Sequence, residues 1–322
     1  MKAAMIFLAG AAFVCASAPA RATDYPSKPI TLMIGFAPGG PSDVMARILT
    51  KKMEEILKQP LVIENRAGAG GSIAGAAVAR AAPDGYTVLL ATGSLLAINV
   101  SLYKNIGYDP EKDFEPIGLI GTQTNVLYIN PSVSARSLGE LIAYAKANPG
   151  KLSFGSGGNG TPAHLAGELL KLEAKTDITH VPFRGTGPVL QAVIGGHVPM
   201  AFNPPSPLLP HIQSGTIRAL AVTTLKRTEV LPEVPTIAES GFPGFEATTW
   251  HALVAPAGTP KDVIATLHRA TAATVNDPLV RKALTDLGVD VVGGTPEELR
   301  AYVKSEIPKW AEVVRASGAK VD

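Results

Sequence analysis

Short, mainly apolar runs alternate along this chain with longer segments in which apolar residues recur at helical spacing. Residues 30–36 (ITLMIGF), 87–92 and 152–155 are runs of the first kind, which indicate buried β-strands. Residues 41–57 and 162–174 have the spacing of amphipathic helices. The alternation predicts an α/β protein whose sheets are mainly parallel.

Several helix starts are marked by capping residues. Ser137 with Glu140, and Thr295 with Glu298, have the spacing of capping boxes and predict that helices begin at these points. Thr161 followed by proline predicts another start, directly after a glycine-rich stretch.

Length and charge narrow the possible functions. The chain has 322 residues and favours two domains, at roughly 150 residues per domain. No Pro- or Ser-rich linker separates them, which fits a chain that crosses between lobes within strands. The net charge of +2 gives no electrostatic footprint for nucleic acid, so we expect no nucleic-acid partner.

The N-terminus has the layout of a secretory signal peptide. Lys2 precedes a long apolar stretch that ends at the small residues around Ala20 and Ala22, so residues 1–22 are expected to be cleaved before Thr23. The alternative is a membrane anchor, but the run is short for a span of about 20 residues. We therefore expect an exported mature chain that is not inserted in the membrane and lacks Cys15, the only cysteine.

Glycine-rich segments follow several of the predicted strands and precede helices. Such a segment lets the backbone approach a ligand, and a helix N-terminus offers unpaired N–H groups to an anion. In open α/β sheets ligands lie beyond the carboxyl ends of strands, so the set predicts a site for a carboxylate or a phosphate. The alternative is that each glycine serves a tight turn. The segments are residues 36–40, 67–71, 92–94, 155–161, 184–187 and 203–206.

Gly155, Gly157 and Gly160 formally match the dinucleotide-binding pattern G-x-G-x-x-G. In that motif, however, the helix begins within the glycines and an acidic residue ends the next strand, whereas here Thr161 starts the helix later and Asp177 precedes the next strand. No phosphate-binding G-K-[ST], no G-x-S-x-G elbow and no paired metal-ligand spacing is present. These absences argue against a secreted hydrolase or dehydrogenase, and we expect no cofactor, metal or catalysis.

Single side chains leave alternatives open. His164 could donate to an anion or lie on the helix surface, and Asp43 could orient the first helix or contact a ligand through water. Arg184 could pair with a ligand carboxylate or form a surface or inter-lobe salt bridge. Trp250 and Phe36 could wall a pocket or fill a core.

The ordered set of motifs is similar to the Bug/TctC family, the extracytoplasmic solute receptors of tripartite tricarboxylate transporters, over essentially the whole mature chain. The motifs are residues 36–43 (FAPGGPSD), 64–71 (ENRAGAGG), 155–168, 182–185 (PFRG), 218–222 (RALAV) and 232–236 (PEVPT).

This resemblance implies a type II periplasmic-binding-protein fold, with two α/β lobes that close on a small carboxylate. It implies lobe 1 at residues 23 to about 122 plus about 225–322, and lobe 2 at about 123–224. It also implies a carboxylate held by backbone N–H groups and water at the first loop. The candidate ligand-binding residues are Phe36, Ala37, Pro38, Gly39, Gly40, Asp43, Gly93, Ser94, Ser156, Gly157, Gly160, Thr161, His164, Arg184, Gly185, Thr186 and Asn203.

One departure from the family pattern bears on the ligand. Pro199 stands where relatives commonly have an acidic residue, and Asn203 is neutral where some have Asp. A neutral side chain cannot neutralise a ligand ammonium, so we expect a mono- or dicarboxylate without an amino group.

The resemblance also implies a partner. We expect a monomeric periplasmic receptor that delivers its ligand to the membrane subunits of a tripartite-type transporter. The alternative is the same receptor reporting to a two-component sensory system.

Overall fold

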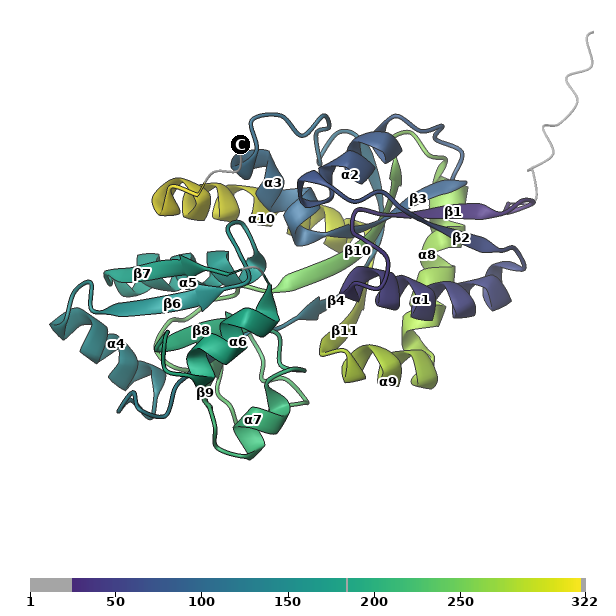
Figure 1. Ribbon diagram of the computed structural model, residues 1–322. Helices are drawn as coiled ribbons and strands as arrows, with labels where there is room; N and C mark the ends of the chain where they lie inside the picture. Colours follow the sequence, from purple (N-terminus) through teal and green to yellow (C-terminus); the bar gives the residue numbers. More distant parts are fainter. Residues whose placement is uncertain (1–24, 184, 320–322) are drawn as a thin grey trace, which may run out of the picture.

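The computed structural model describes residues 25–183 and 185–319. It contains two lobes side by side, each built on its own β-sheet (Figure 1). The strand order is β11-β4-β10-β3-β1-β2 in lobe 1 and β7-β6-β8-β5-β9 in lobe 2. The chain has the type II periplasmic-binding-protein fold, as predicted. The predicted signal peptide and its cleavage site lie outside the described residues.

In lobe 1, helices cover both faces of the sheet. The strands are β1 (Ile30–Ile34), β2 (Leu61–Asn65), β3 (Thr87–Thr92), β4 (Phe114–Gln123), β10 (Thr249–Pro256) and β11 (Val289–Gly294). The helices are α1 (Pro41–Leu57), α2 (Ser72–Ala79), α3 (Asn99–Leu102), α8 (Lys261–Asn276), α9 (Pro278–Asp286) and α10 (Pro296–Ser317), with short turns η1 (Ala69–Gly71) and η2 (Ser94–Ile98). Helices α1, α8 and α9 pack on one face, and α2, α3 and α10 on the other.

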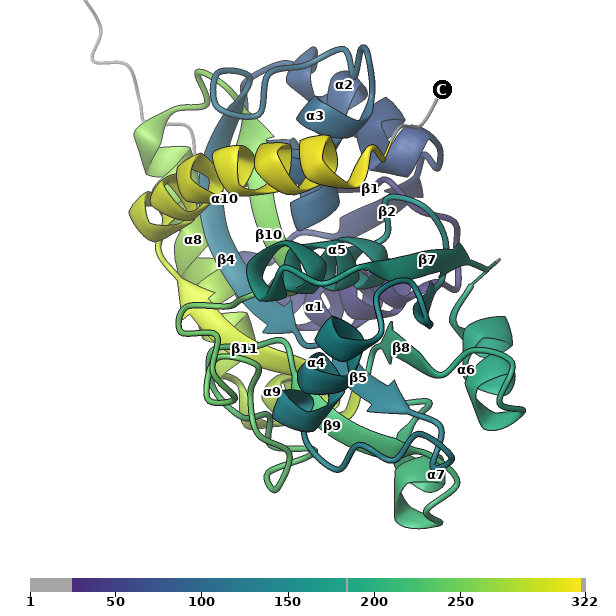
Figure 2. The same ribbon diagram turned by 90° about the vertical axis from the view of Figure 1, so that its left-hand side faces the viewer.

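Lobe 2 is smaller and shares part of its core with lobe 1. Its strands are β5 (Val126–Ile129), β6 (Leu152–Ser156), β7 (Ile178–Pro182), β8 (Met200–Asn203) and β9 (Arg218–Val222). Its helices are α4 (Leu138–Ala147), α5 (Pro162–Ala174), α6 (Thr186–Ile194) and α7 (Leu209–Gln213). One apolar cluster includes both Leu165 of α5 and Trp310 of α10, and Figure 2 shows α10 running alongside α5.

The chain crosses between the lobes after β4 and again after β9, and the two crossings are joined by hydrogen bonds. The Asn125 N–H donates to Thr223 Oγ1 at 2.9 Å, and the Thr223 N–H donates to the Asn125 carbonyl at 3.0 Å. Thr124, Asn125 and Thr223 are all buried. Thr236, in the stretch between β9 and β10, pairs with Val222 at the end of β9. Part of that stretch therefore lies against the sheet of lobe 2. The exact lobe limits stay predictions.

The prediction of mainly parallel sheets was wrong. Strand β1 is parallel to β2 and β3, and β6 is parallel to β7 and β8, but β5, β10 and β11 pair antiparallel with their neighbours. The reason lies in the crossings. Strands β5 and β10 each begin just after a crossing, at the end of their sheet that faces the other lobe. They therefore run opposite to the strands whose carboxyl ends point toward the crossings.

The predicted helix starts are confirmed. Ser137, Thr161 and Thr295 are N-caps whose side chains accept backbone N–H groups. Only the Thr295 cap is a full capping box, because the carboxylate of Glu140 accepts from the backbone of Arg136 instead of its own cap. Within the described ranges, no helix is both long and apolar enough to span a bilayer.

A buried carboxylate ties α10 to the sheet of lobe 1. Glu306 is 2% exposed, and its Oε2 accepts from the indole Nε1 of Trp250 at 3.1 Å and of Trp310 at 2.8 Å. Lys309 donates to its other oxygen. Both tryptophans are therefore core residues, and a buried charge with three donors is fully hydrogen-bonded.

Replacing this carboxylate should destabilise the whole fold. We expect Glu306→Gln to lower the free energy of unfolding by about 2–4 kcal/mol, because an amide cannot accept from both indoles and also neutralise Lys309. Urea denaturation followed by far-UV circular dichroism measures this. The matched control is Glu312→Gln on the exposed side of the same helix, which should stay within about 0.5 kcal/mol of wild type. Equal loss in both variants would contradict the role of Glu306.

Candidate functional site

The first glycine loop, residues 36–40, joins β1 to α1 and begins the helix without a side-chain cap. Gly39 has φ +79°, a conformation that favours glycine, and Gly40 is the N-cap residue. With Pro41 at the first helical position, the backbone N–H groups of Ser42 and Asp43 lie in a first turn that no cap side chain serves. This helix start can therefore accept an anion.

Asp43 holds this loop in place. Its Oδ2 accepts from the Gly39 N–H at 3.0 Å and from Arg47 Nε at 2.9 Å, while its Oδ1 accepts from Asn65 Nδ2 at 3.1 Å. The Arg47 hydrogen bond, followed by that from Gly39, lowers the pKa of this carboxyl to about 2. Asn65 also donates to the Phe36 carbonyl at 3.0 Å. The carboxylate thus orients the loop and the helix, one of the two roles that the sequence left open.

The neighbouring glycine segment packs directly on the first loop. Gly68, Ala69, Gly70 and Gly71 all have positive φ, and a Cβ on Gly35 would lie 2.6 Å from the Gly71 Cα. The glycine segment therefore touches the backbone at Gly35, between β1 and the first loop, and glycine is required at the contact.

Gly93 and Ser94 follow β3. A Cβ on Gly93 would lie 2.6 Å from Trp250 Nε1, so this glycine makes room for a core side chain. Ser94 is half-buried at the start of η2.

In lobe 2, residues 156–161 form a loop whose polar side chains point inward. The buried Ser156 Oγ contacts the backbone N and O of Gly158 at 3.2 and 3.1 Å and lies 2.7 Å from His180 Nε2. His164 is 4% exposed, and its Nδ1 accepts from the Gly160 N–H at 3.0 Å. The interpretation of His164 as a surface residue was wrong. Both side chains hold the loop, and neither presents a free polar group to solvent.

The helix after this loop begins where the sequence placed it. Thr161 Oγ1 accepts from the His164 N–H at 3.3 Å and donates to the Gly158 carbonyl at 2.8 Å, and Pro162 occupies the first helical position. The start of α5 is thus internally capped, and α5 begins after the last glycine, unlike the dinucleotide-binding arrangement.

The start of α6 lies beside this loop, and no side chain of the described residues caps it. The Gly185 N–H donates to the Gly157 carbonyl at 3.1 Å, and Gly185, with φ +105°, precedes Thr186 without a side-chain cap. Arg184, the candidate cation, lies outside the described residues.

Asn203 ends β8 next to this helix start. Its Nδ2 donates to Tyr128 Oη at 3.0 Å and to the Thr186 carbonyl at 3.2 Å. Its Oδ1 is buried and has no partner within the described part of the chain. A buried acceptor without a partner is unfavourable, so Asn203 Oδ1 is a candidate contact for a hydrogen-bond donor of a ligand or of water.

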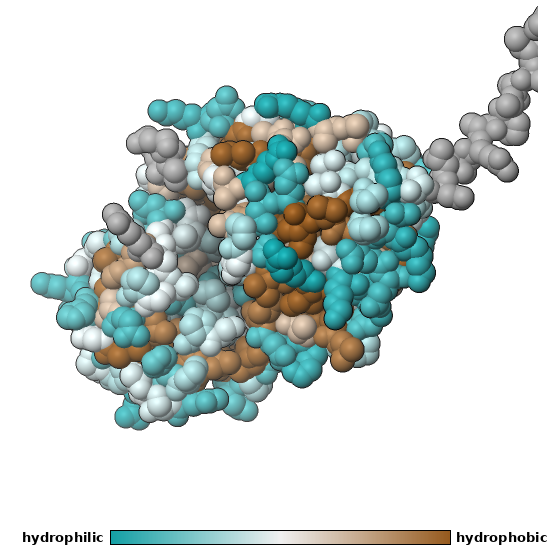
Figure 3. All heavy atoms as spheres, turned by 45° about the vertical axis from the view of Figure 1, so that its right-hand side comes forward, coloured by the Kyte–Doolittle hydropathy of each residue, from teal (hydrophilic) through white to brown (hydrophobic). Residues whose placement is uncertain are grey.

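The two lobes touch on either side of the space between these loops. A Cβ on Gly160 would lie 2.5 Å from Leu102 of α3, and one on Gly288 would lie 3.1 Å from Pro205. Figure 3 shows the surface hollowed where the lobes meet. The parallel strands β1 and β3 in lobe 1, and β6 and β8 in lobe 2, end toward this hollow, as expected for a ligand cleft.

Sequence reasoning missed His251. It lies on β10 opposite Thr92 and Gly121, in the row of residues at the carboxyl end of β3. It is 3% exposed, and its Nδ1 has no hydrogen-bond partner among the residues that the structure describes. Burial lowers its pKa to about 4, so the imidazole is neutral. A lone histidine in an apolar strand carries no local signal, and only strand pairing brings it to this edge.

A separate pocket of about 470 Å³ lies elsewhere on lobe 2 and is lined in part by Ser132, Glu140, Tyr144, Lys151 and Pro199. These residues are at the opposite edge of the sheet, where β6 and β8 begin. Because parallel α/β sheets bind ligands beyond the carboxyl ends of their strands, we assign the site to the glycine loops rather than to this pocket.

The profile of the tripartite tricarboxylate transporter family receptor, TctC, matches residues 45–319. The chain belongs to this receptor family. It is 40% identical to the protein BugT of Bordetella pertussis over 317 residues, 98% of this chain and 96% of that one.

Solved TctC relatives share the fold as well. The periplasmic binding protein BugD is 38% identical with a TM-score of 0.73, over 92% of this chain and 99% of that one. The Rhodopseudomonas palustris protein Rpa4515, solved with adipate, is 36% identical with a TM-score of 0.76, over 92% and 99%. The MatC protein of the same species, solved with malate, is 35% identical with a TM-score of 0.73, over 90% and 100%.

Separating the two contacting backbones should disturb the site. We expect Gly35→Ala to lower the free energy of unfolding by about 1–3 kcal/mol, because the added methyl meets backbone that cannot move away cheaply. Thermal and urea denaturation measure this.

The matched control for this substitution is Gly139→Ala in α4. A Cβ there meets only Ser137 Oγ at 3.9 Å, and alanine favours helix, so stability should be unchanged or higher. A Gly35→Ala protein as stable as wild type would show that the loop contact is not tight.

Proposed function

We propose that this chain is a periplasmic receptor that closes on a small dicarboxylate and delivers it to a tripartite-type membrane transporter. The observation that carries the proposal is the pair of helix starts without side-chain caps, α1 in lobe 1 and α6 in lobe 2, at strand ends that face one cleft. Each offers backbone N–H groups and the positive end of a helix dipole to one carboxylate.

The chemistry of the cleft supports an anion held by backbone groups. Asp43, the charged candidate in the first loop, is already paired with Arg47, and Asn203 is neutral. The R. palustris relatives solved with adipate and malate support the same ligand class. A dicarboxylate that contacts both lobes favours the closed form over the open one and so shifts the population toward it.

The remaining parts of the proposal follow from the sequence and the family. We propose export through the signal peptide, cleavage before Thr23, and function as a monomer without metal, cofactor or catalysis. For the ligand contacts we propose the backbone of residues 36–40 with Ser94 on lobe 1. On lobe 2 we propose Gly157, Arg184, Gly185, Thr186 and Asn203. Asp43, Ser156, Thr161 and His164 then position the loops.

A thermal-shift screen of residues 23–322 tests the function. Adipate and malate should raise the melting temperature, since a ligand at 100 times its Kd stabilises a protein by about 2.7 kcal/mol. Monocarboxylates of equal length should stabilise less, because they occupy one helix start only. Titration calorimetry confirms each hit. Stabilisation by sugars or amines, with none by any carboxylic acid, would refute the proposal.

Asn203 should decide whether the ligand carries an amino group. Malate and aspartate differ only in a hydroxyl and an ammonium, so the ratio of their Kd values isolates this position. We expect Asn203→Asp to weaken malate binding about tenfold relative to aspartate, through repulsion of the acid and attraction of the ammonium.

Exposed Asn105 offers the control for this change. Its Oδ1 accepts from the Gly107 N–H, so Asn105→Asp keeps its contact and should leave the ratio unchanged. An unchanged ratio in Asn203→Asp as well would show that Asn203 does not face the ligand.

A further inference from the structure

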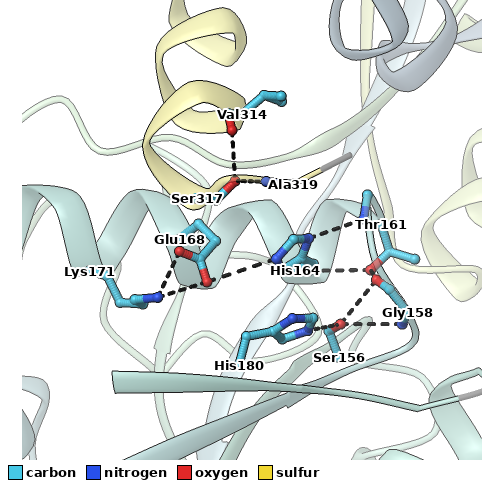
Figure 4. A network of polar contacts seen from close by, with 11 residues as sticks. Ser156, Gly158, Thr161, His164, Glu168, Lys171, His180, Val314, Ser317 and Ala319 are labelled. Carbon is cyan, nitrogen blue, oxygen red and sulfur yellow. Dashed lines mark hydrogen bonds and ion pairs between the residues drawn. The ribbon is translucent and has the colours of Figure 1, made fainter. Parts of the chain in front are cut away.

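Two histidines from different elements stack behind the lobe 2 glycine loop. His164 of α5 and His180 of β7 have ring centroids 3.9 Å apart and planes 24° apart (Figure 4). Phe154 lies beside the pair, with its ring centroid 4.9 Å from that of His180. His164 is buried and His180 is half-buried. We call these two side chains the histidine pair.

Each ring of the histidine pair holds one end of the loop. His164 Nδ1 accepts from the Gly160 N–H at 3.0 Å, and His180 Nε2 lies 2.7 Å from Ser156 Oγ, which in turn contacts both backbone groups of Gly158. Figure 4 shows both rings facing the loop from its inner side. The positions of Gly158 and Gly160 therefore depend on the two imidazoles.

The hydrogen bond from Gly160 requires a neutral His164. An N–H donor needs the lone pair of Nδ1, which places the ring proton on Nε2, 3.8 Å from Glu168 Oε1. A protonated His164 would have no acceptor for Gly160, and that backbone N–H would be left without its partner. Acid thus acts directly on the contact that holds the loop.

The surroundings of the histidine pair oppose protonation. Among residues 25–183 and 185–319, the charged groups that face it are Glu168 and Lys171 of α5, ion-paired at 2.8 Å. The last turn of α10 faces it with the uncharged Ser317, whose hydroxyl donates to the Val314 carbonyl (Figure 4). Burial first, then the facing His180 and Lys171, lowers the pKa of His164 to about 3, and burial with Lys171 lowers that of His180 to about 4.

The loop is also where the lobes meet. Gly160, with φ +74°, packs on Leu102 of α3, which directly follows the η2 turn that begins at Ser94. The Gly157 carbonyl accepts from Gly185 at the open start of α6. A displaced loop would therefore disturb both the proposed anion site and the contact between lobes.

We propose that His164 and His180 are positioning residues that hold the lobe 2 loop ready for the ligand, and that acid releases the loop and weakens binding. The effect on ligand binding rests on the proposed function, whereas the release of the loop does not.

The sign follows from the two states of the loop. A released imidazole protonates near its ordinary pKa of about 6.5, whereas the stacked pair resists protonation to about pH 4. The fraction of molecules with a released loop therefore rises as the pH falls from about 6.5 to about 4.

The test compares three variants with wild type by titration with adipate and with malate at pH 7.5, 6.5 and 5.5. His164→Asn keeps an acceptor near the position of Nδ1 but cannot be protonated. His164→Leu removes the acceptor. His197→Asn, on an exposed histidine, is the matched control. At each pH, the ratio of a variant's Kd to that of wild type cancels the ionisation of the acid itself.

We expect His164→Leu to bind about tenfold more weakly than wild type at pH 7.5, the factor for one lost hydrogen bond. His164→Asn should match wild type at pH 7.5 and bind more tightly than wild type at pH 5.5. His197→Asn should equal wild type throughout. A constant ratio of His164→Asn to wild type across the three pH values would overturn the acid release.

Amide hydrogen exchange of Gly158, Gly160 and Thr161 without ligand provides a second readout. After correction for intrinsic rates, exchange in wild type should quicken from pH 7.5 to pH 5.5 relative to His164→Asn. Equal protection in the two proteins at both pH values would overturn the acid release, and wild-type protection in His164→Leu would overturn the positioning role, even if neither acid binds. If exchange responds as expected but no carboxylate binds any variant, the proposed function fails and the loop mechanism stands.

Discussion

Two crossings between the lobes, hydrogen-bonded to each other through Asn125 and Thr223, set how the two lobes face one another. Strands β5 and β10 enter their lobes from this shared edge, so the strands that run opposite to them must end at it. The glycine loops after those strands are thereby brought to one cleft. The site therefore depends on the direction of the crossing strands more than on any single side chain.

Side chains near the cleft serve mainly to shape backbone. Asp43 holds the Gly39 N–H and pairs with Arg47, while Ser156 and His164 hold the lobe 2 loop from inside. The contacts that we propose for the ligand are mainly backbone N–H donors at two helix starts. Such donors are fixed by the helices, so recognition of an anion there requires little reordering of side chains.

The lobes do not meet symmetrically. On the side of α5 and α10 they share an apolar core, and Glu306 of α10 holds both tryptophans of that region. Gly160 meets Leu102, which belongs to this core, whereas Gly288 meets Pro205 away from it. Separation of the lobes at Gly288 and Pro205 therefore costs less than separation across the shared core, which suits a hinge movement about the crossings.

The sequence by itself determined the α/β alternation, the caps at Ser137, Thr161 and Thr295, and the glycine-rich strand ends, because each depends on residues a few positions apart. The tertiary structure alone decided that the sheets are mixed, that Ser156 and His164 turn inward, that α6 starts open while α5 is capped, and that His251 lies at the carboxyl edge. These features depend on partners such as His180, Thr92 and Gly157, which lie far away in the chain, and local patterns carry no information about such partners.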